Sequence, residues 1–218
     1  MSRLGERFWQ YKTAFADGDA LGTFLDNHDQ DRFFQYVPGG DLQLAKSALT
    51  YLLLSQGIPI GTLLPLHTSL SLFWFFFALT GTNDQSRNRK PLWWIGFDTS
   101  APLYKFIAFV NKIRGTYRVW RYPQKEGWSG DDLYVFTRGP VLVALTNRRA
   151  PNPQTLPGTS HNFRPGERVC NLFFPSADCE TVGADGTLRI VLLNGEQKIF
   201  VPKRTLRTVG LDERVSDG

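Results

Sequence analysis

The sequence predicts an α/β region followed by an antiparallel all-β region, with the change near residue 115. Before that point, apolar residues recur at helical spacing in three segments that alternate with short apolar runs. After it, apolar and polar residues alternate in short runs that are separated by Gly, Pro, Asn and Asp. The second pattern is typical of the strands of an antiparallel sandwich.

The first region contains three predicted helices and two predicted strands. The helices are expected at residues 6–15, 42–55 and 103–114. Asp41 is suited to cap the second helix, while Gly57 and Gly115 are expected to end the second and third. The strands are expected at residues 21–25 and 58–60 and should be buried, because both runs are apolar.

Six strand-like runs follow in the second region. They span residues 117–120, 133–136, 141–145, 169–174, 188–193 and 198–201. Asn194-Gly195 is a strong signal for a β-hairpin turn between the last two runs. The residues beyond Arg204 are polar, so this end is expected to fray.

The composition fits a globular protein and argues against nucleic acid as a partner. Of 218 residues, 42% are hydrophobic, which is enough to supply a core. Lys and Arg exceed Asp and Glu by 25 − 20 = 5, but the basic residues are scattered and show no aromatic-basic pattern. Cys170 and Cys179 could form a small disulfide loop in an oxidising compartment or remain two buried thiols. No secretory signal opens the sequence.

A dense polar cluster directly follows the first predicted strand. Residues 24–32 carry three carboxylates, a histidine, an asparagine and an arginine. On an extended backbone Asp29 and Asp31 share one side, and His28 points to the other. Such a cluster can be a turn or a helix cap, but crowded carboxylates also suit a site that handles positive charge.

Residues 24–32, Phe-Leu-Asp-Asn-His-Asp-Gln-Asp-Arg, resemble the motif that closes the seventh barrel strand of α-amylases, glycoside hydrolase family 13. Residues 54–60 resemble the eighth strand of that family, and residues 81–84 with 88–93 resemble the loop after it. Residues 103–114 resemble the last barrel helix, and residues 181–188 resemble the C-terminal β domain of fungal α-amylases. The resemblance implies a C-terminal remnant of a (β/α)₈ TIM barrel at 1–114, an antiparallel β-sandwich at 115–205 and a tail at 206–218.

The resemblance also implies an activity and roles for individual residues. The family cleaves internal α-1,4-glucosidic bonds of starch or glycogen by a retaining mechanism. Asp29 matches the carboxylate that stabilises the transition state, and His28 matches its substrate-binding neighbour. Asp84 and Arg89 match positions that hold outer glucose rings, although their spacing is one residue longer here. Arg32 is expected to be a structural partner of nearby acids, and the implied protein is extracellular, monomeric and a binder of α-glucans.

Two catalytic groups of the family are missing from the sequence. The nucleophile and the general acid belong to motifs after the fourth and fifth barrel strands, and neither motif occurs here. The calcium ligands of the family also lie upstream, so calcium is a family cofactor for which this chain is expected to offer no metal site. We therefore expect a truncated glycosidase that is inactive alone.

Residues 61–80 interrupt the resemblance, which resumes at Gly81. The interruption is apolar and nearly uncharged, and residues 63–79 approach the length of a membrane span, but Pro65 and His67 argue against one. The Leu, Pro, Ser and Phe residues of this stretch have pyrimidine-rich codons, and an intron carries a pyrimidine tract before its acceptor site. The composition therefore favours the hypothesis that residues 61–80 are a retained intron.

Two alternatives to a truncated glycosidase remain. One is a membrane-associated amylase derivative, and the other is a non-catalytic carbohydrate-binding module that uses Trp120 or Trp128 of the sandwich.

Overall fold

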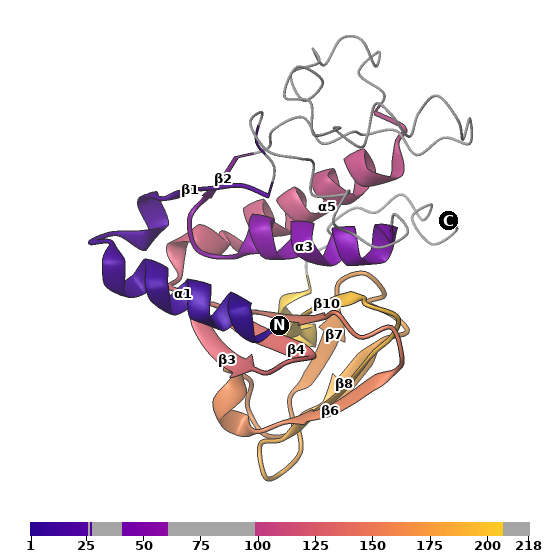
Figure 1. Cartoon of the computed structure of the whole chain (residues 1–218). Coiled ribbons are helices and arrows are strands. Elements are labelled where there is room, and N and C mark those ends of the chain that lie inside the picture. The colour runs from indigo at the N-terminus through magenta and orange to yellow at the C-terminus, as the bar shows by residue number, and fades with distance from the viewer. Residues whose placement is uncertain (26, 28–40, 61–98, 207–218) are drawn as a thin grey trace.

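The computed structural model describes residues 1–25, 27, 41–60 and 99–206 (Figure 1). At its centre lies a six-stranded antiparallel sheet in the order β3-β4-β5-β10-β7-β8. Three α-helices lie over one face of this sheet, and a two-stranded ribbon, β6-β9, packs on the other. The described residues thus form three layers, helix, sheet and ribbon.

The helices are α1 (Ser2–Ala14), α3 (Leu42–Leu54) and α5 (Pro102–Tyr117). Asp41 caps α3 as predicted, because its Oδ1 accepts hydrogen bonds from the backbone N–H groups of Gln43 at 3.0 Å and Leu44 at 3.1 Å. The first helix begins four residues earlier than the predicted position 6.

The predicted end of the last helix is wrong. Helix α5 continues through Gly115 to Tyr117, and Arg118 directly after it takes the left-handed conformation with φ 48°. The extra turn buries Tyr117, whose hydroxyl donates to the carbonyl of Thr205 at 3.2 Å. Residues 117–120 therefore do not form the predicted strand, and Val119–Arg121 form a 3₁₀ helix, η5.

Ten short strands occur in the described residues. Their bounds are β1 Gly22–Thr23, β2 Ile58–Pro59, β3 Lys125–Ser129, β4 Leu133–Arg138, β5 Val141–Thr146, β6 Asn152–Leu156, β7 Arg168–Asn171, β8 Cys179–Thr181, β9 Leu188–Leu192 and β10 Gln197–Pro202. Strands β4, β5, β9 and β10 confirm four predicted runs. Strand β7 ends at Asn171, three residues before the predicted end, because the chain turns there and crosses to β8.

Strands β4 and β5 are buried along their whole length because both faces of the sheet are covered. Tyr134 and Phe136 belong to the core shared with α3 and α5. Leu133 and Val135, which alternate with them, belong to the core shared with the β6-β9 ribbon. Two hydrophobic cores, one on each face, thus hold the central sheet.

The predicted Asn194-Gly195 turn is present, but the predicted hairpin is not. Asn194 and Gly195 have φ 48° and 75°, and the Gly195 N–H donates to the carbonyl of Arg148 at 2.8 Å. Strand β9 before the turn pairs with β6, whereas β10 after it pairs with β5 and β7. The turn therefore carries the chain from one sheet to the other.

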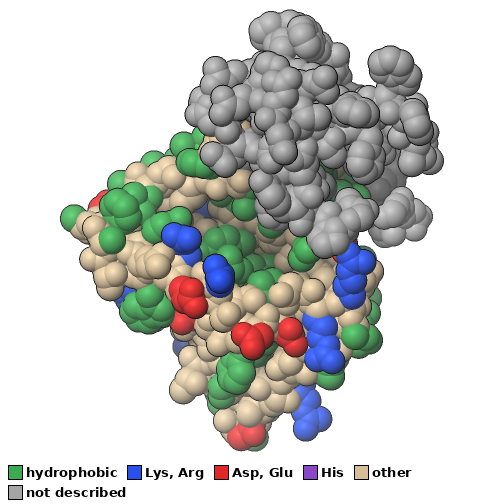
Figure 2. Space-filling view, in the orientation of Figure 1, with side chains coloured by type: hydrophobic (Ala, Val, Ile, Leu, Met, Phe, Trp, Pro, Cys, Tyr) green, Lys and Arg blue, Asp and Glu red, His purple; other side chains and the backbone are tan. Residues whose placement is uncertain are grey.

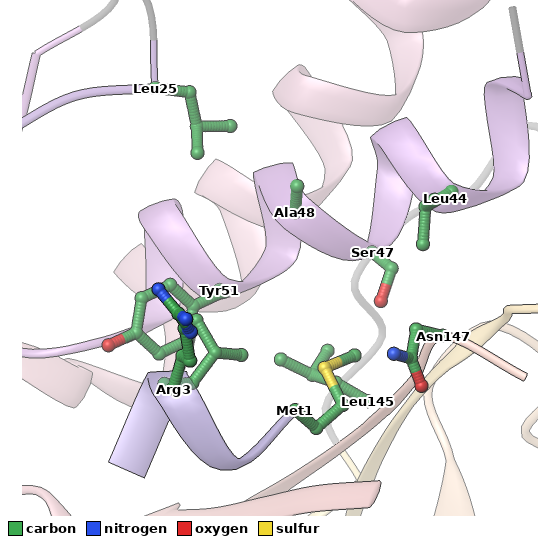
Figure 3. Close-up of a pocket in the computed structure, with 10 residues that line it drawn as sticks. Met1, Arg3, Leu25, Leu44, Ser47, Ala48, Tyr51, Leu145 and Asn147 are labelled. Carbon is green, nitrogen blue, oxygen red and sulfur yellow. The ribbon is translucent and has the colours of Figure 1, made fainter. Parts of the chain in front are cut away.

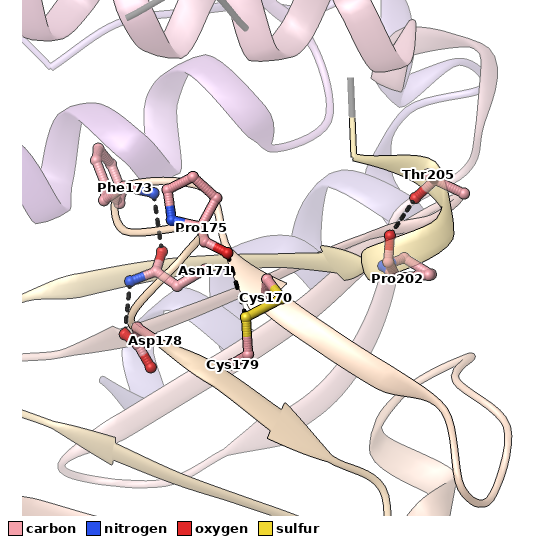
Figure 4. The surroundings of a disulfide bond; sticks show 8 residues. All are labelled: Cys170, Asn171, Phe173, Pro175, Asp178, Cys179, Pro202 and Thr205. Atoms are coloured by element: carbon pink, nitrogen blue, oxygen red, sulfur yellow. Dashed lines mark hydrogen bonds between the residues drawn. A yellow bond between two sulfur atoms is a disulfide. The ribbon is translucent and has the colours of Figure 1, made fainter. Parts of the chain in front are cut away.

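The two cysteines form a disulfide between β7 and β8, which settles the alternative that the sequence left open (Figure 4). Cys170 and Cys179 are directly opposite each other in the strand pair. Beside them, the Asn171 side chain accepts the Phe173 N–H and donates to Asp178. The disulfide and this side chain close the turn that places Phe173 against Phe106 and Phe109 of α5.

Candidate functional site

The predicted site residues follow two parallel strands, β1 and β2. His28, Asp29 and Arg32 lie outside the described residues, as do Asp84, Arg89 and the whole interruption at 61–80. Phe24, Leu25 and Asn27 of the motif are described. The structure therefore describes the two strands that precede the predicted site residues. The roles of His28, Asp29, Asp84 and Arg89 stay predictions.

Strands β1 and β2 pair in parallel, with Gly22 opposite Ile58 and Thr23 opposite Pro59. The Ile58 N–H donates to Leu21 O and the Ile60 N–H donates to Thr23 O, both at 2.7 Å. Parallel strands end at the same edge of a sheet, so the motif after β1 and the segment after β2 leave from a common edge.

The expected burial of these two strands is wrong for the described structure. Phe24 is 52% exposed, Ile58 56% and Ile60 47%. Among the described strands β1 and β2 pair only with each other and form a two-stranded ribbon with two free edges.

Gly57 and Arg114 fix the turn from α3 into β2. Gly57 has φ 108°, and a Cβ on it would lie 2.8 Å from the carbonyl oxygen of Leu21. The Arg114 guanidinium of α5 donates to Leu53 O at 2.6 Å and to Gly57 O at 3.2 Å. Burial lowers the pKa of Arg114, and the charge of Asp19 opposes that change. Helix α5 thus holds β2 in place through a carbonyl in the last turn of α3, that of Leu53, and through the carbonyl of Gly57 directly before β2.

A second buried guanidinium, that of Arg138, holds the other side of the same turn. Its Nη1 donates to Ser55 O at 2.7 Å, and its Nε donates to Tyr122 O at 2.9 Å. Its Nη2 donates to Asp19 Oδ1 at 2.9 Å. Burial lowers the pKa of Arg138, while Asp19 raises it. No sequence pattern indicates this role, because Arg138 is a single basic residue at the end of an apolar run.

A pocket of about 420 Å³ opens between α1, α3 and the end of β5, directly below the start of the motif (Figure 3). Its lining is mostly apolar, and Figure 2 shows hydrophobic side chains gathered in a hollow between α1 and α3. The residues that line it are Met1, Arg3, Leu4, Leu25, Leu44, Ser47, Ala48, Tyr51, Leu145 and Asn147. Burial raises the pKa of Tyr51 to about 12, so its hydroxyl is protonated at neutral pH and is not a base there.

The described residues do not fit a calcium site or a membrane span. Within the described ranges, no group of three or more His, Cys, Asp and Glu residues could hold a metal ion. In the same part of the chain, no helix is long and apolar enough to cross a membrane.

Two exposed tryptophans lie on the all-β region and its connection to α5. Trp120 is 47% exposed, and the Arg114 guanidinium lies 5.9 Å from the centre of its ring. Trp128 is 42% exposed on β3. Exposed aromatic rings of this kind can stack on sugars, which keeps them as candidates for carbohydrate contact.

The chain is similar to curated α-amylases of yeasts. No protein-family model matches it. The α-amylase of Saccharomycopsis fibuligera is 24% identical over 208 residues, which make up 93% of this chain and 39% of that protein. Alpha-amylase 2 of Schwanniomyces occidentalis is 29% identical over 203 residues, 88% of this chain and 36% of that protein. The chain therefore spans less than half the length of these relatives.

Solved structures agree with the sequence comparison. An α-amylase from Malbranchea cinnamomea matches with a TM-score of 0.77 and 30% identity, over 95% of this chain and 42% of that one. The α-amylase of Geobacillus thermoleovorans, solved with acarbose, matches with a TM-score of 0.68 and 20% identity, over 90% of this chain and 42% of that one, and shows a shared fold. Both comparisons cover the helical part as well as the β-rich part of the chain.

Proposed function

We propose that this chain supplies part of the active site of an α-amylase. The premise is that the chain is similar to the C-terminal region of fungal-type α-amylases of glycoside hydrolase family 13. The reaction is the retaining endohydrolysis of α-1,4-glucosidic bonds in starch or glycogen. In this proposal Asp29 stabilises the transition state and His28 binds the sugar at the cleaved bond. Asp84 and Arg89 bind outer glucose rings, and the enzyme acts as an extracellular monomer.

The observation that carries the proposal is the parallel pairing of β1 with β2. Residues 24–32 follow β1, and the segment that contains Asp84 and Arg89 follows β2, so both leave the same strand edge. Active sites of (β/α)₈ barrels are built at this edge, from residues at the ends of several strands. The pairing supports a reading of residues 1–114 as the last strands and helices of a barrel, followed by the β domain at 115–205 and a tail at 206–218.

The proposal includes that the 218-residue chain is inactive alone. A retaining glycosidase needs a nucleophile and a general acid in addition to the carboxylate assigned to Asp29. The sequence holds neither family motif for these two groups. Removing one member of a cooperating catalytic set costs several orders of magnitude in rate, so two missing members should abolish measurable hydrolysis.

The test joins the missing region to the chain. The segment of the Saccharomycopsis fibuligera α-amylase that precedes the matched region is fused to Met1, and hydrolysis of soluble starch is measured for the chain alone and for the fusion. We expect activity only in the fusion, and a decrease of kcat of at least about a thousandfold on Asp29→Asn. An Asp29→Asn fusion that keeps its kcat would refute the assigned role, and starch hydrolysis by the chain alone would refute its inactivity.

A second candidate function is carbohydrate binding without catalysis, which the exposure of Trp120 and Trp128 favours. Retention of the 218-residue chain on insoluble starch, lost in the double variant Trp120→Ala and Trp128→Ala, would support it. Equal retention of the wild type and the double variant would exclude these two rings as the binding surface.

A further inference from the structure

The turn that follows α5 carries one buried residue and three exposed ones. It consists of Arg118 and the 3₁₀ helix η5, and the Arg121 N–H donates to Arg118 O at 2.9 Å. Val119 is fully buried and fixes the turn to the core that α5 shares with the central sheet. Arg118, Trp120 and Arg121 are exposed. A tryptophan ring thus lies at the surface of a turn that carries two arginines.

The ring of Trp120 is suited to stack on a sugar ring. It is 47% exposed, and the guanidinium of Arg114 lies 5.9 Å from its centre. Arg114 is itself fixed, because it donates to the carbonyls of Leu53 and Gly57. A ring that is held in this way loses little conformational entropy when a ligand stacks on it.

The same turn carries positive charge that the described structure does not pair. The hydrogen bond between Arg121 and Arg118 closes a turn, which brings their Cα atoms within about 7 Å of each other. Among the described residues, neither arginine forms an ion pair. The charge of Asp19 acts on Arg114, but Asp19 is paired with Arg138 at 2.9 Å. Both exposed guanidinium groups are therefore available to one anion.

A phosphate monoester on a sugar matches this combination of groups. Phosphate carries a charge of about −1.5 to −2 at neutral pH, and guanidinium groups bind it through paired N–H···O bonds. The apolar face of the sugar ring stacks on the indole. A neutral sugar would use the indole alone and would gain no ionic contact.

We propose that the surface formed by Arg118, Trp120 and Arg121 binds α-glucans that carry phosphate monoesters. The inference rests on the proposed function for the choice of a glucan, and it goes beyond that function in the charge of the glucan. Trp120 contacts a glucose ring, and the two arginines contact a phosphate group on the same chain. The ionic contact gives phosphorylated glucans a higher affinity than neutral ones.

The test compares two forms of one polysaccharide. Part of an amylopectin sample is phosphorylated chemically, and affinity electrophoresis gives the dissociation constant of the 218-residue chain for each form. At an ionic strength of about 10 mM, the wild type should bind the phosphorylated form at least about tenfold more tightly. Equal affinity for the two forms would overturn the inference, because the arginines would then serve only the C-terminal dipole of α5.

The double variant Arg118→Gln and Arg121→Gln tests the assigned side chains. It should bind the two forms with affinities within about twofold of each other and keep the wild-type affinity for unmodified amylopectin. A double variant that keeps the wild-type preference for the phosphorylated form would overturn the inference. Thermal unfolding of each variant verifies that it is folded.

A matched variant separates this surface from the net charge of the chain. Arg164→Gln and Arg168→Gln together remove the same two charges from exposed positions, one before β7 and one on it. This variant should keep the preference for phosphorylated amylopectin. An equal loss in both double variants would overturn the inference, because the net charge of +5 would then account for the attraction.

Trp120→Ala tests the aromatic contact. It should weaken binding of both forms of amylopectin by at least about fivefold, because both use the indole. Unchanged binding of both forms by this variant would overturn the inference.

The outcome for catalysis is separate, since the binding experiment uses the chain without any upstream region. A chain that prefers phosphorylated amylopectin, but whose fusion hydrolyses no starch, would uphold the binding surface and refute the proposed catalytic function. A fusion that hydrolyses starch, with a chain that does not distinguish the two forms, would do the reverse.

Discussion

The Nη2 atom of Arg138 lies 2.9 Å from Oδ1 of Asp19, and this ion pair joins the central sheet to the turn that precedes β1. The Arg138 side chain is only 1% exposed, whereas that of Asp19 is 46% exposed. A charge this deeply buried is tolerated when it is paired and hydrogen-bonded, and here three acceptors surround it. The pair therefore connects the β-rich part of the chain with the scaffold of the candidate site.

Replacement of Arg138 by Met should destabilise the chain strongly. The change leaves the carbonyl oxygens of Ser55 and Tyr122 without their donor and removes the partner of Asp19. We expect the free energy of unfolding to fall by about 3–5 kcal/mol, because two carbonyl oxygens each lose a charged donor and a hydrogen bond to a charged group contributes about 1.5–3 kcal/mol. Urea unfolding followed by tryptophan fluorescence measures this loss.

The matched control is Arg148→Met. Arg148 and Asp132 lie 3.8 Å apart and are 50% and 55% exposed, so loss of this pair should cost less than about 1 kcal/mol. Equal losses for the two variants would show that Arg138 does not hold the turn in the way described.

Gly139 is expected to tolerate no side chain, because both its backbone and its neighbour exclude one. Its φ is 60°, and a Cβ would lie 2.5 Å from the ring of Tyr122. Gly139→Ala should therefore lower the free energy of unfolding by more than the ~1 kcal/mol of backbone strain alone. Gly166→Ala isolates the strain, since Gly166 has φ 75° and nothing lies within 4 Å of the added atom. Thermal unfolding of both variants gives the comparison, and an equal decrease would exclude a clash with Tyr122.

The helical part of the fold could be predicted from the sequence because its signals are local. The apolar spacing of α3 and the cap at Asp41 lie within a few residues of each other, and both are confirmed. The end of α5 depended on a distant contact, that of Tyr117 with Thr205, which outweighs the low helix propensity of Gly115. No local pattern reports such a contact.

The β-rich part shows the same limit. Strands β4 and β5 are apolar on both faces and were predicted, whereas β6, with the sequence Asn-Pro-Gln-Thr-Leu, has almost no apolar alternation. It forms because β9 supplies the hydrogen bonds and Leu156 reaches the core under the ribbon. Of the candidate site, the sequence predicted the strand pair that carries it, while Arg114 and Arg138 could not be found because their partners are backbone carbonyls far away in the chain.

Removal of the disulfide should lower stability without changing the fold of the sheet. Cys170 and Cys179 are nine residues apart, and closing a loop of about this length stabilises by about 2–3 kcal/mol in the chain-entropy description. We expect the double variant Cys170→Ala and Cys179→Ala to lose this amount in urea unfolding under oxidising conditions. A reducing agent should lower the stability of the wild type to that of the variant and leave the variant unchanged. A wild type that is insensitive to the reducing agent would contradict a contribution of the disulfide to stability.

His161 is held in its neutral form by its surroundings. The side chain is 7% exposed, and its Nδ1 accepts the backbone N–H of Phe163 at 3.3 Å, which a protonated Nδ1 could not do. Burial lowers the pKa of His161 below its usual value of 6.5, and the backbone of Gly186 only partly opposes this. The ring also stacks on Phe163, with the two ring centres 5.3 Å apart.

This lowered pKa predicts a loss of stability in mild acid. The unfolded chain binds a proton at a higher pH than the folded chain, so the contribution is fully present above pH 6.5. It is lost as the pH falls from there through the lower pKa of the folded state. We expect the urea midpoint of the wild type to decrease across this window relative to that of His161→Asn, whose side-chain oxygen can still accept the Phe163 N–H but does not titrate. His28 and His67 are common to both proteins, so the difference between them reports His161. A difference that stays constant from pH 8 to pH 4.5 would show that the folded and unfolded chains bind this proton equally.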